Sequence, residues 1–413
     1  MSTSAVSLIV VSLNRPDALC RCLAAIEQLD YSEFEVIVVA DAAGQSASEA
    51  AGFSDRIKSV TFDTPNISAA RNVGLSRASG GIVAFIDDDA VPEPTWLSFL
   101  VDPFRNEIVA AAGGFVVGRN GISLQYGARS VDRFGTHSPL IMKGNEAQVF
   151  DPPDGAAIKT EGTNCAFRRD ALLAMGGFDP AFAFFMDETD LNLRLAKAGA
   201  RTAIAPLAQV HHGFAASQRR RSDRVPLSLH DIGASQMVLL RKHAVGVRID
   251  PVLDRLRAEQ KARMVRHLVS GACEPRDVRR LLNSLEAGLI EGKIRPIRPL
   301  RPIPATAEAF VRFRPRTPFK GDNYRAGRIW SSSRLRRETR KQVETGVRMT
   351  LFLFSPTALY HRVRFTRGGY WEQTGGVFGR SDRDGRMFQP VSFPKRVSRE
   401  IRRIGTVRGL HFG

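Results

Sequence analysis

The first ninety residues alternate short apolar runs with helical patterns, and this alternation limits the possible fold more than any other feature of the chain. The predicted strands are 7–13, 34–39, 57–62 and 82–86. Helices are predicted between them, and the helix at 67–78 ends before Gly80-Gly81. Strands that alternate with helices are typical of a parallel sheet with crossover connections. The sequence therefore predicts an α/β domain.

The pattern is weaker after residue 94. We expect loops and a hairpin at 118–157, a short helix at 170–175 and a longer helix at 188–198. Further predicted features are helical patterns at 225–243 and 251–290, a Pro- and Arg-rich strap at 295–318, and a basic, Gly-rich segment at 320–413 that has no clear assignment. We divide the chain into an α/β domain at 1–245 and a basic, mostly helical and irregular extension at 246–413.

Charge is distributed very unevenly along the 413 residues. The net charge is +18, but residues 1–215 contribute −8 and residues 216–413 contribute +26. The four cysteines form no CxxC pair, and Cys20 and Cys22 are too close for an ordinary disulfide within one helical turn. We expect a cytoplasmic protein, with the second half suited to an anionic partner.

Three consecutive acids, Asp87-Asp88-Asp89, follow directly on the predicted strand 82–86. Ligands of open α/β sheets bind outside the carboxyl ends of the strands. Adjacent carboxylates repel one another unless a cation or hydrogen bonds offset their charge, and Mg²⁺ or Mn²⁺ accepts carboxylate oxygens and bridges to a diphosphate. We interpret these acids as a metal site; the alternative is a solvated acidic turn.

Seven short motifs follow one another along the first half of the chain. The first four are the apolar run 6–11 with Asn14-Arg15-Pro16, the run 35–39, Arg71-Asn72-x-Gly74, and Asp87-Asp88-Asp89. The last three are Asn164-x-Ala166-Phe167-Arg168 with Gly176-Gly177-Phe178-Asp179, Asp187-Glu188-Thr189-Asp190-x-x-x-Arg194, and Pro206-x-Ala208-x-Val210-x-His212. Over about residues 6–215 the chain resembles the family 2 inverting glycosyltransferases, which have the GT-A fold.

The resemblance implies roles for the acids in the first half of the chain. Asp87 corresponds to the acid that contacts the ribose region, and Asp89 to the metal ligand. Asp41 corresponds to an acid that binds the base or ribose, although the family usually has two acids where this chain has Ala40-Asp41. A helix cap or a turn is the alternative for Asp41.

Three further positions resemble groups that surround the donor in the family. Arg71 and Asn72 correspond to positions that approach the nucleotide and its phosphates, with an exposed helix face as the alternative. His212 corresponds to a position where a histidine completes the metal or diphosphate site, with a structural histidine as the alternative. An imidazole ligand suits Mn²⁺ better than Mg²⁺.

The pair Asp187-Glu188 is the candidate for general-base chemistry. A base must take the proton of an acceptor hydroxyl while that oxygen attacks the sugar. The family's base is usually the Asp of a Glu-Asp pair; here the order is reversed, which puts Glu188 at the base position and leaves Asp187 as the alternative. Both acids could instead simply favour the positive end of a helix.

The resemblance implies an enzyme that moves a sugar from a nucleotide-diphosphate sugar to a hydroxyl of a glycan or lipid-linked acceptor. It further implies inversion, a Mn²⁺ or Mg²⁺ cofactor, and a role in cell-surface polysaccharide or glycolipid synthesis. The alternative is a non-catalytic protein that binds a sugar nucleotide or an anionic polymer. Acids at both ends of one pocket favour the enzyme.

Three uses compete for the basic half, which begins at Arg219-Arg220-Arg221. These are contact with an anionic membrane or a lipid-linked phosphate, binding of nucleic acid, and a solvated surface. Trp330, Phe365 and the segment Gly369-Tyr370-Trp371 could add an interfacial patch, or a small satellite core. No nucleic-acid motif is present at 320–413, so we favour a peripheral membrane surface over nucleic acid.

Overall fold

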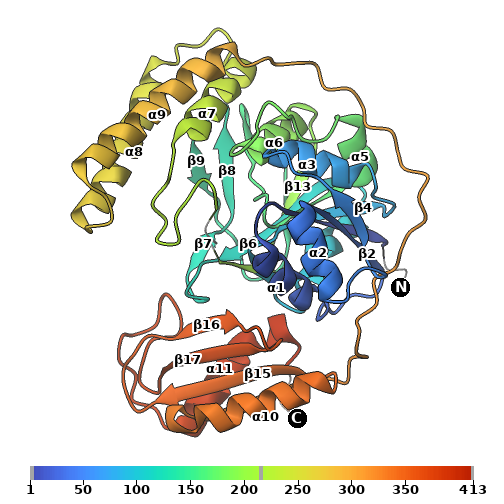
Figure 1. Cartoon of the computed structure of the whole chain (residues 1–413), viewed down its shortest axis with the longest axis vertical. Helices are drawn as coiled ribbons and strands as arrows, with labels where there is room; N and C mark the ends of the chain where they lie inside the picture. The colour runs from blue at the N-terminus through green and yellow to red at the C-terminus, as the bar shows by residue number, and fades with distance from the viewer. Residues whose placement is uncertain (1–3, 214–216, 411–413) are drawn as a thin grey trace.

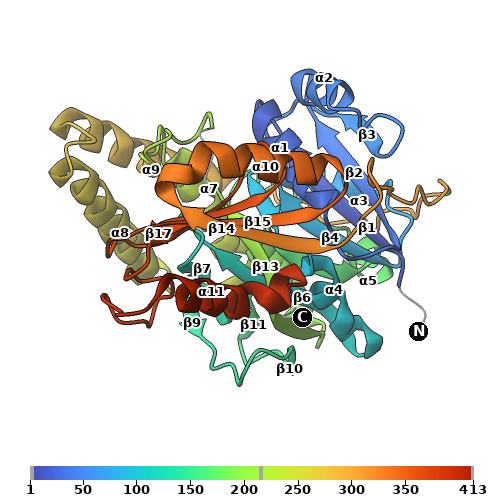
Figure 2. The same cartoon turned by 90° about the horizontal axis from the view of Figure 1, so that it is seen from below.

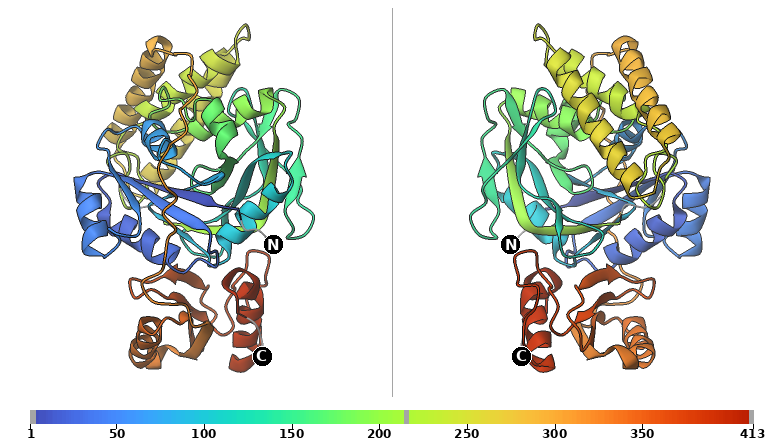
Figure 3. Two further views of the ribbon diagram at one scale, coloured as in Figure 1. Left: turned by 90° about the vertical axis from the view of Figure 1, so that its right-hand side faces the viewer. Right: turned by 90° about the vertical axis from the view of Figure 1, so that its left-hand side faces the viewer.

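The computed structural model describes residues 4–213 and 217–410. The chain forms an amino-terminal α/β domain, a helical unit (α7–α9), a strap (295–321) and a carboxy-terminal unit (322–410) (Figure 1). The carboxy-terminal unit lies below the α/β domain in Figure 1, and the strap runs down one side of that domain to reach it, as the side views in Figure 3 also show.

A ten-stranded mixed sheet forms the centre of the α/β domain. Its main order is β10-β13-β6-β12-β4-β1-β2-β3, and the pairs β1·β2, β1·β4, β2·β3 and β13·β6 are parallel. The strands are β1 (Val6–Ser12), β2 (Phe34–Ala40), β3 (Lys58–Thr61), β4 (Ile82–Asp87), β5 (Ala90–Pro92), β6 (Val109–Val117), β7 (Leu124–Tyr126), β10 (Gln148–Phe150), β12 (Cys165–Arg168) and β13 (Arg201–His212). The α/β class predicted from the sequence is confirmed.

Helices cover both faces of this sheet. Leu8 and Val10 of β1 belong to the core on one face and Ile9 to the core on the other, because successive strand side chains alternate. The first core includes side chains of α1 (Pro16–Ile26) and α4 (Trp96–Val101); the second includes side chains of α3 (Ile67–Leu75), α5 (Arg169–Ala174) and α6 (Asp187–Lys197). α2 (Ala42–Ala50) lies beside α1. Burial on both faces explains the uninterrupted apolar strands.

The segment expected to hold loops and a hairpin contains more strand than the sequence suggested. β8 (Arg129–Asp132), β9 (His137–Pro139) and β11 (Ala156–Ile158) form a separate three-stranded sheet in the order β11-β8-β9. Each of these strands has only three or four residues. Such short strands carry too few alternating positions for a period of two to be recognised.

The helical unit consists of α7 (His230–His243), α8 (Asp250–Val269) and α9 (Pro275–Ile294). Leu240 of α7, Leu253 of α8 and Leu285 of α9 share one hydrophobic cluster. On its other side α7 packs Val238 and Leu239 against Phe182 of the α/β domain. The division placed at residue 245 therefore falls between helices that share one core.

The carboxy-terminal unit is a second, smaller α/β structure (Figure 2). Its sheet has the order β14-β15-β17-β16, built from β14 (Asp322–Arg328), β15 (Arg348–Ser355), β16 (Arg362–Phe365) and β17 (Trp371–Gly376). α10 (Ser332–Glu344) covers the face with Leu351 and Leu353, and α11 (Phe393–Arg408) covers the face with Phe352 and Phe354. The extension is helical at 250–294 and irregular in the strap, as expected, but the sequence did not reveal this sheet.

The strap is held against the edge of the α/β domain. The amide of Phe313 donates to the carbonyl of Phe34 at 2.7 Å, and the two rings are 5.3 Å apart. The amide of Val311 donates to the buried Glu35 carboxylate at 3.1 Å. Phe313 is only 4% exposed, whereas Val311 is 36% exposed.

We expect Phe313→Ala to lower the free energy of unfolding by about 3 kcal/mol, because a buried aromatic ring is lost and a cavity remains. Urea unfolding measures the loss, and trypsin should cut the variant faster at Arg312 or Arg316. Val311→Ala on the same strap is the control, with an expected cost below about 1 kcal/mol. Equal trypsin resistance of Phe313→Ala and the parent protein would contradict this account of the strap.

Candidate functional site

The site lies at the carboxyl ends of β1 and β4. Val11 of β1 is paired with Asp87, the last residue of β4, and Asp88 and Asp89 lead into β5. β5 pairs with the end of β13, and this register places His212 opposite Ala90, next to Asp89. The fold thus brings together two segments that are far apart in the sequence.

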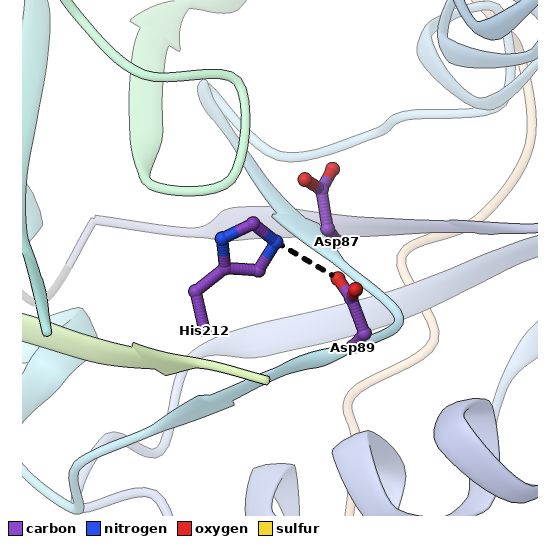
Figure 4. Close-up of side chains that lie close together, drawn as sticks. All are labelled: Asp87, Asp89 and His212. Atoms are coloured by element: carbon purple, nitrogen blue, oxygen red, sulfur yellow. Dashed lines mark ion pairs between the residues drawn. The ribbon is translucent and has the colours of Figure 1, made fainter. Parts of the chain in front are cut away.

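Asp87, Asp89 and His212 form a cluster that fits a divalent cation. Each offers one ligand atom, and these atoms lie within 4.8 Å of one another. The Nε2 atom of His212 is 3.1 Å from a carboxylate oxygen of Asp89 (Figure 4). This spacing is shorter than twice a metal–oxygen bond of about 2.1 Å, so both atoms can contact one cation, and carboxylates with an imidazole are donors that suit Mn²⁺. The residues present therefore fit the implied metal ion.

The protonation of His212 couples this cluster to pH. Burial lowers the pKa of His212, but the hydrogen bond to Asp89 and the charge of Asp89 outweigh burial and raise it above its ordinary value. A protonated imidazole cannot ligate a metal, so metal binding must release this proton. Binding should therefore weaken as the pH falls through the raised pKa.

Arginines offset the charge of the three acids. Arg15 lies 2.6 Å from Asp88 and 3.3 Å from Asp89, and Arg220 lies 3.8 Å from Asp89. Asp88 also accepts a hydrogen bond from the Ser12 hydroxyl at 2.7 Å. Burial raises the pKa of Asp88 to about 7, although Arg15 opposes the shift. Arg15 and Ser12 engage both carboxylate oxygens of Asp88, whereas Asp87 and Asp89 lie in the cluster with His212.

Arg71 joins the acid motif to the candidate base pair. It is 3% exposed, and its guanidinium donates to Asp87 at 3.1 Å and to the carbonyl of Gly162 at 3.0 Å. On its other side it forms an ion pair with Asp187. Burial lowers the pKa of Arg71, but Asp187 and Asp87 raise it above its ordinary value, so it stays charged. Arg71 is a buried bridge and not part of an exposed helix face.

Asp187 and Glu188 begin α6 and differ in their surroundings. Asp187 is 3% exposed and faces Arg71, whereas the Glu188 side chain is 18% exposed and lies 2.7 Å from the Lys159 ammonium. Burial raises the pKa of Asp187. Burial would also raise the pKa of Glu188, but Lys159 and a hydrogen bond from Asp187 lower it to about 2. Of the two acids, Glu188 is the one within reach of solvent.

Residues 7–175 match the family model described as Glycosyl transferase family 2. This part of the chain is therefore similar to the family 2 glycosyltransferases. The match includes the acids at 87–89 and ends before Asp187 and His212, whose places come from the geometry above.

Individual relatives cover only part of the chain. A pre-mycofactocin glycosyltransferase of Mycobacterium tuberculosis is 34% identical over 145 residues, which are 35% of this chain and 29% of the relative. A glucosyl-dolichyl phosphate glucuronosyltransferase of Haloferax volcanii is 28% identical over 173 residues, which are 41% of this chain and 53% of the relative. The chain thus spans about a third to a half of the length of these relatives.

Among solved structures, the mannosyltransferase PcManGT of Pyrobaculum calidifontis, in complex with GDP-Man and Mn²⁺, is similar with a TM-score of 0.43 and 18% identity. The similarity covers 71% of this chain and 88% of that one.

Two positions that the family resemblance assigns to the nucleotide make structural contacts here. Asp41 caps α2, because its carboxylate accepts from the amides of Gly44 at 2.8 Å and Asn14 at 2.7 Å. Asn72 accepts from the amide of Phe178 at 2.8 Å and donates to the carbonyl of the same residue at 2.7 Å. Their nucleotide roles stay predictions, and the cap anticipated as the alternative for Asp41 is present.

Sequence reasoning did not assign Arg15 or Lys159 to the site. Arg15 lies three residues after the end of β1, so applying the carboxyl-end rule to β1 as well as to β4 would have found it. Lys159 carries no comparable signal, because only the tertiary structure sets it beside Glu188. Of the triplet at 219–221, Arg220 reaches Asp89, whereas Arg219 pairs with Asp231.

A cavity of about 990 Å³ lies away from the acids at 87–89, between the end of α1, the strap and the carboxy-terminal unit. Its lining mixes apolar side chains such as Phe313 with ion-paired ones such as Arg348 and Arg312. None of the lining residues belongs to the cluster that fits a metal. The chemistry of the donor atoms, and not cavity size, locates the site.

We expect Asp89→Asn to weaken Mn²⁺ binding by about 100-fold or more, since even residues that only support ligands contribute 10–100-fold. Asparagine keeps the shape of the side chain and removes its charge. Electron paramagnetic resonance of free Mn²⁺ measures the affinity, and Asp102→Asn, at an acid whose side chain is 58% exposed, is the control. Parent-like Mn²⁺ affinity of Asp89→Asn would rule out Asp89 as a ligand.

Proposed function

We propose that the protein transfers a sugar from a nucleotide-diphosphate sugar to a hydroxyl of a glycan or lipid-linked acceptor, with inversion at the anomeric carbon. The main observation behind this proposal is that Arg71 forms ion pairs both with Asp87, in the cluster that fits a metal, and with Asp187, in the acid pair 187–188. This arrangement supports a cation site for a diphosphate and, next to it, a carboxylate for an acceptor. The family 2 assignment of residues 7–175 supports the same activity.

In the proposed reaction the acceptor oxygen attacks the anomeric carbon while the bond from that carbon to the diphosphate oxygen breaks. Glu188 takes the hydroxyl proton, and the nucleoside diphosphate leaves with the bonding electrons. A bound divalent ion would stabilise the charge that develops on the leaving group. Attack on the face opposite the leaving group inverts the configuration.

Arg15 and Arg220 have a second use in this proposal. Both are paired with Asp89, and their side chains are 23% and 25% exposed. A cation that binds Asp89 replaces part of this pairing and leaves guanidinium donors for phosphate oxygens. Arginine suits that task because its planar fork donates two parallel hydrogen bonds.

We expect Glu188→Gln to lower kcat by about 10²–10⁴-fold with little change in donor binding, because the amide keeps the shape and loses the proton acceptor. Asp187→Asn is the matched comparison, and its main effect should be on stability, because it removes a buried partner of Arg71. Steady-state kinetics and thermal melting separate the two. A larger loss of kcat in Asp187→Asn would exchange the two roles.

A binding protein that holds a sugar nucleotide without turning it over is the alternative function. A thermal-shift screen of UDP-, GDP- and TDP-sugars with and without Mn²⁺ identifies the donor, because a ligand that binds the folded state raises the melting temperature. Incubation of the stabilising donor with lipid-linked and free glycan acceptors then tests for release of nucleoside diphosphate. Stabilisation without release under any acceptor would favour the binding protein.

For the acceptor side we infer a lipid-linked substrate reached from the cytoplasmic face of a membrane. No helix among the described residues is long and apolar enough to cross a bilayer. Phe365 and Trp371 are buried, so the interfacial patch considered for them is replaced by a core. α10 supports surface attachment instead, since Trp330 just before it is 70% exposed and Arg337, Arg340 and Lys341 are exposed along it.

We expect the triple variant Arg337→Gln, Arg340→Gln, Lys341→Gln to reduce binding to anionic vesicles on the order of 100-fold, since each basic residue contributes about 1 kcal/mol. The control triple, Lys261→Gln, Arg266→Gln, Arg279→Gln, removes the same charge from α8 and α9. Co-sedimentation with anionic and neutral vesicles at low and high salt measures both. Equal losses in the two triples would indicate a diffuse charge effect, and binding to RNA alone would revive the nucleic-acid alternative.

A further inference from the structure

The last turn of α11 reaches into the α/β domain through Arg408. Its Nε and Nη2 atoms donate to the two carboxylate oxygens of Glu93 at 2.8 Å each. Both residues are 2% exposed. Burial would raise the pKa of Glu93, but Arg408 lowers it to about 2, so the pair is ionised. A bidentate buried pair of this kind fixes geometry as well as charge.

Two aromatic rings complete this contact. The Nε2 atom of His211 lies 2.7 Å from the Glu93 carboxylate, and its ring centroid is 4.6 Å from that of Trp371. The Arg408 guanidinium lies over the Trp371 ring at 4.2 Å. We call Arg408, Glu93, His211 and Trp371 the interdomain clamp. It connects α11 and β17 to two strand ends of the α/β domain.

Those two strand ends carry the metal-site residues. β5 begins directly after Asp89 and ends directly before Glu93. It pairs with β13 so that Pro92 is opposite Val210, and Ala90 is opposite His212. The clamp therefore holds the far end of a three-residue strand whose near end carries Asp89.

The alternation of β13 links the clamp to the second ligand. His211 and His212 are consecutive strand residues, so their side chains point to opposite faces. His211 is held by Glu93 and Trp371, whereas His212 faces Asp89. A shift of His211 toward or away from the carboxy-terminal unit would move His212 relative to Asp89.

We propose that Arg408 is a positioning residue for the metal site, and that the carboxy-terminal unit serves as its rigid support. The inference rests on the proposed metal site and adds a role for residues 322–410. Metal ligands must be held within a few tenths of an ångström, and groups that orient them contribute about 10–100-fold to metal affinity. Arg408 acts through Glu93 and the β5·β13 pairing, without touching the metal.

Other contacts also attach the carboxy-terminal unit and provide a control. The Gln28 side chain at the end of α1 donates to the carbonyl of Gly369 at 2.6 Å. This hydrogen bond crosses the same interface, but Gln28 is not part of β5 or β13. Thr95 also donates to the carbonyl of Val407 at 3.0 Å, so the end of α11 keeps a docking contact when the Arg408 side chain changes.

The experiment compares the full-length protein with Arg408→Ala, Arg408→Lys and Gln28→Ala. The Mn²⁺ dissociation constant is measured by electron paramagnetic resonance without a nucleotide sugar, and thermal melting checks the fold. We expect Arg408→Ala to raise the dissociation constant about tenfold or more, Arg408→Lys to raise it less, and Gln28→Ala to leave it unchanged. Lysine retains the charge beside Glu93 but offers no planar fork.

Each outcome bears on a different statement. A parent-like dissociation constant in folded Arg408→Ala overturns the positioning role, and so does an equal rise in Gln28→Ala. If Arg408→Ala fails to fold, Arg408→Lys decides: a parent-like constant overturns the inference and a raised constant supports it. If the parent protein binds Mn²⁺ no better than Asp89→Asn, the metal site itself is wrong and the positioning role fails with it.

Discussion

Negative charge concentrated at the end of β4 is the constraint on which the surrounding structure depends. Buried carboxylates destabilise a fold by several kcal/mol each unless opposite charges and hydrogen bonds offset them. Arg15 comes from the end of β1, Arg71 from α3, and His212 from the end of β13 to meet this need. The same groups make up the candidate site, and in the proposed reaction a cation and phosphates replace part of this pairing.

Arg71 shows how one buried cation can organise two reactive groups. It contacts Asp87 and Asp187, which belong to different segments of the chain. The carbon at the centre of its guanidinium group also lies 5.2 Å from the centroid of the Phe178 ring. Because Asp187 is committed to Arg71, Glu188 is the acid left toward solvent and Lys159. The roles that we propose for the two acids therefore follow from their burial and not from their order in the sequence.

Much of the fold could be predicted from the sequence where the hydrophobic periodicity agrees with the positions of the Gly and Pro residues that end helices and strands. β1, β2, β4, α3 and α6 were anticipated within a few residues, because buried parallel strands give apolar runs and helices show a period near 3.6, although α3 ends at Leu75, before the Gly80-Gly81 pair expected to end it. The sheet of the carboxy-terminal unit was not. The run 351–354 looked like an isolated apolar cluster, whereas it is the centre of β15, covered by a helix on each face.

The sequence by itself determined the α/β class, the acid motif at 87–89 and the pair at 187–188, since these depend on local patterns that survive in one dimension. It could also associate His212 with the metal site through motif order. Only the tertiary structure decided that Asp88 forms an ion pair with Arg15 and that Asn72 hydrogen-bonds to the backbone of Phe178. The same is true of the hydrogen bonds from Arg408 to Glu93 between the two units. The physical reason is that such pairings depend on which side chains burial brings together from distant segments, and neither composition nor periodicity records those distances.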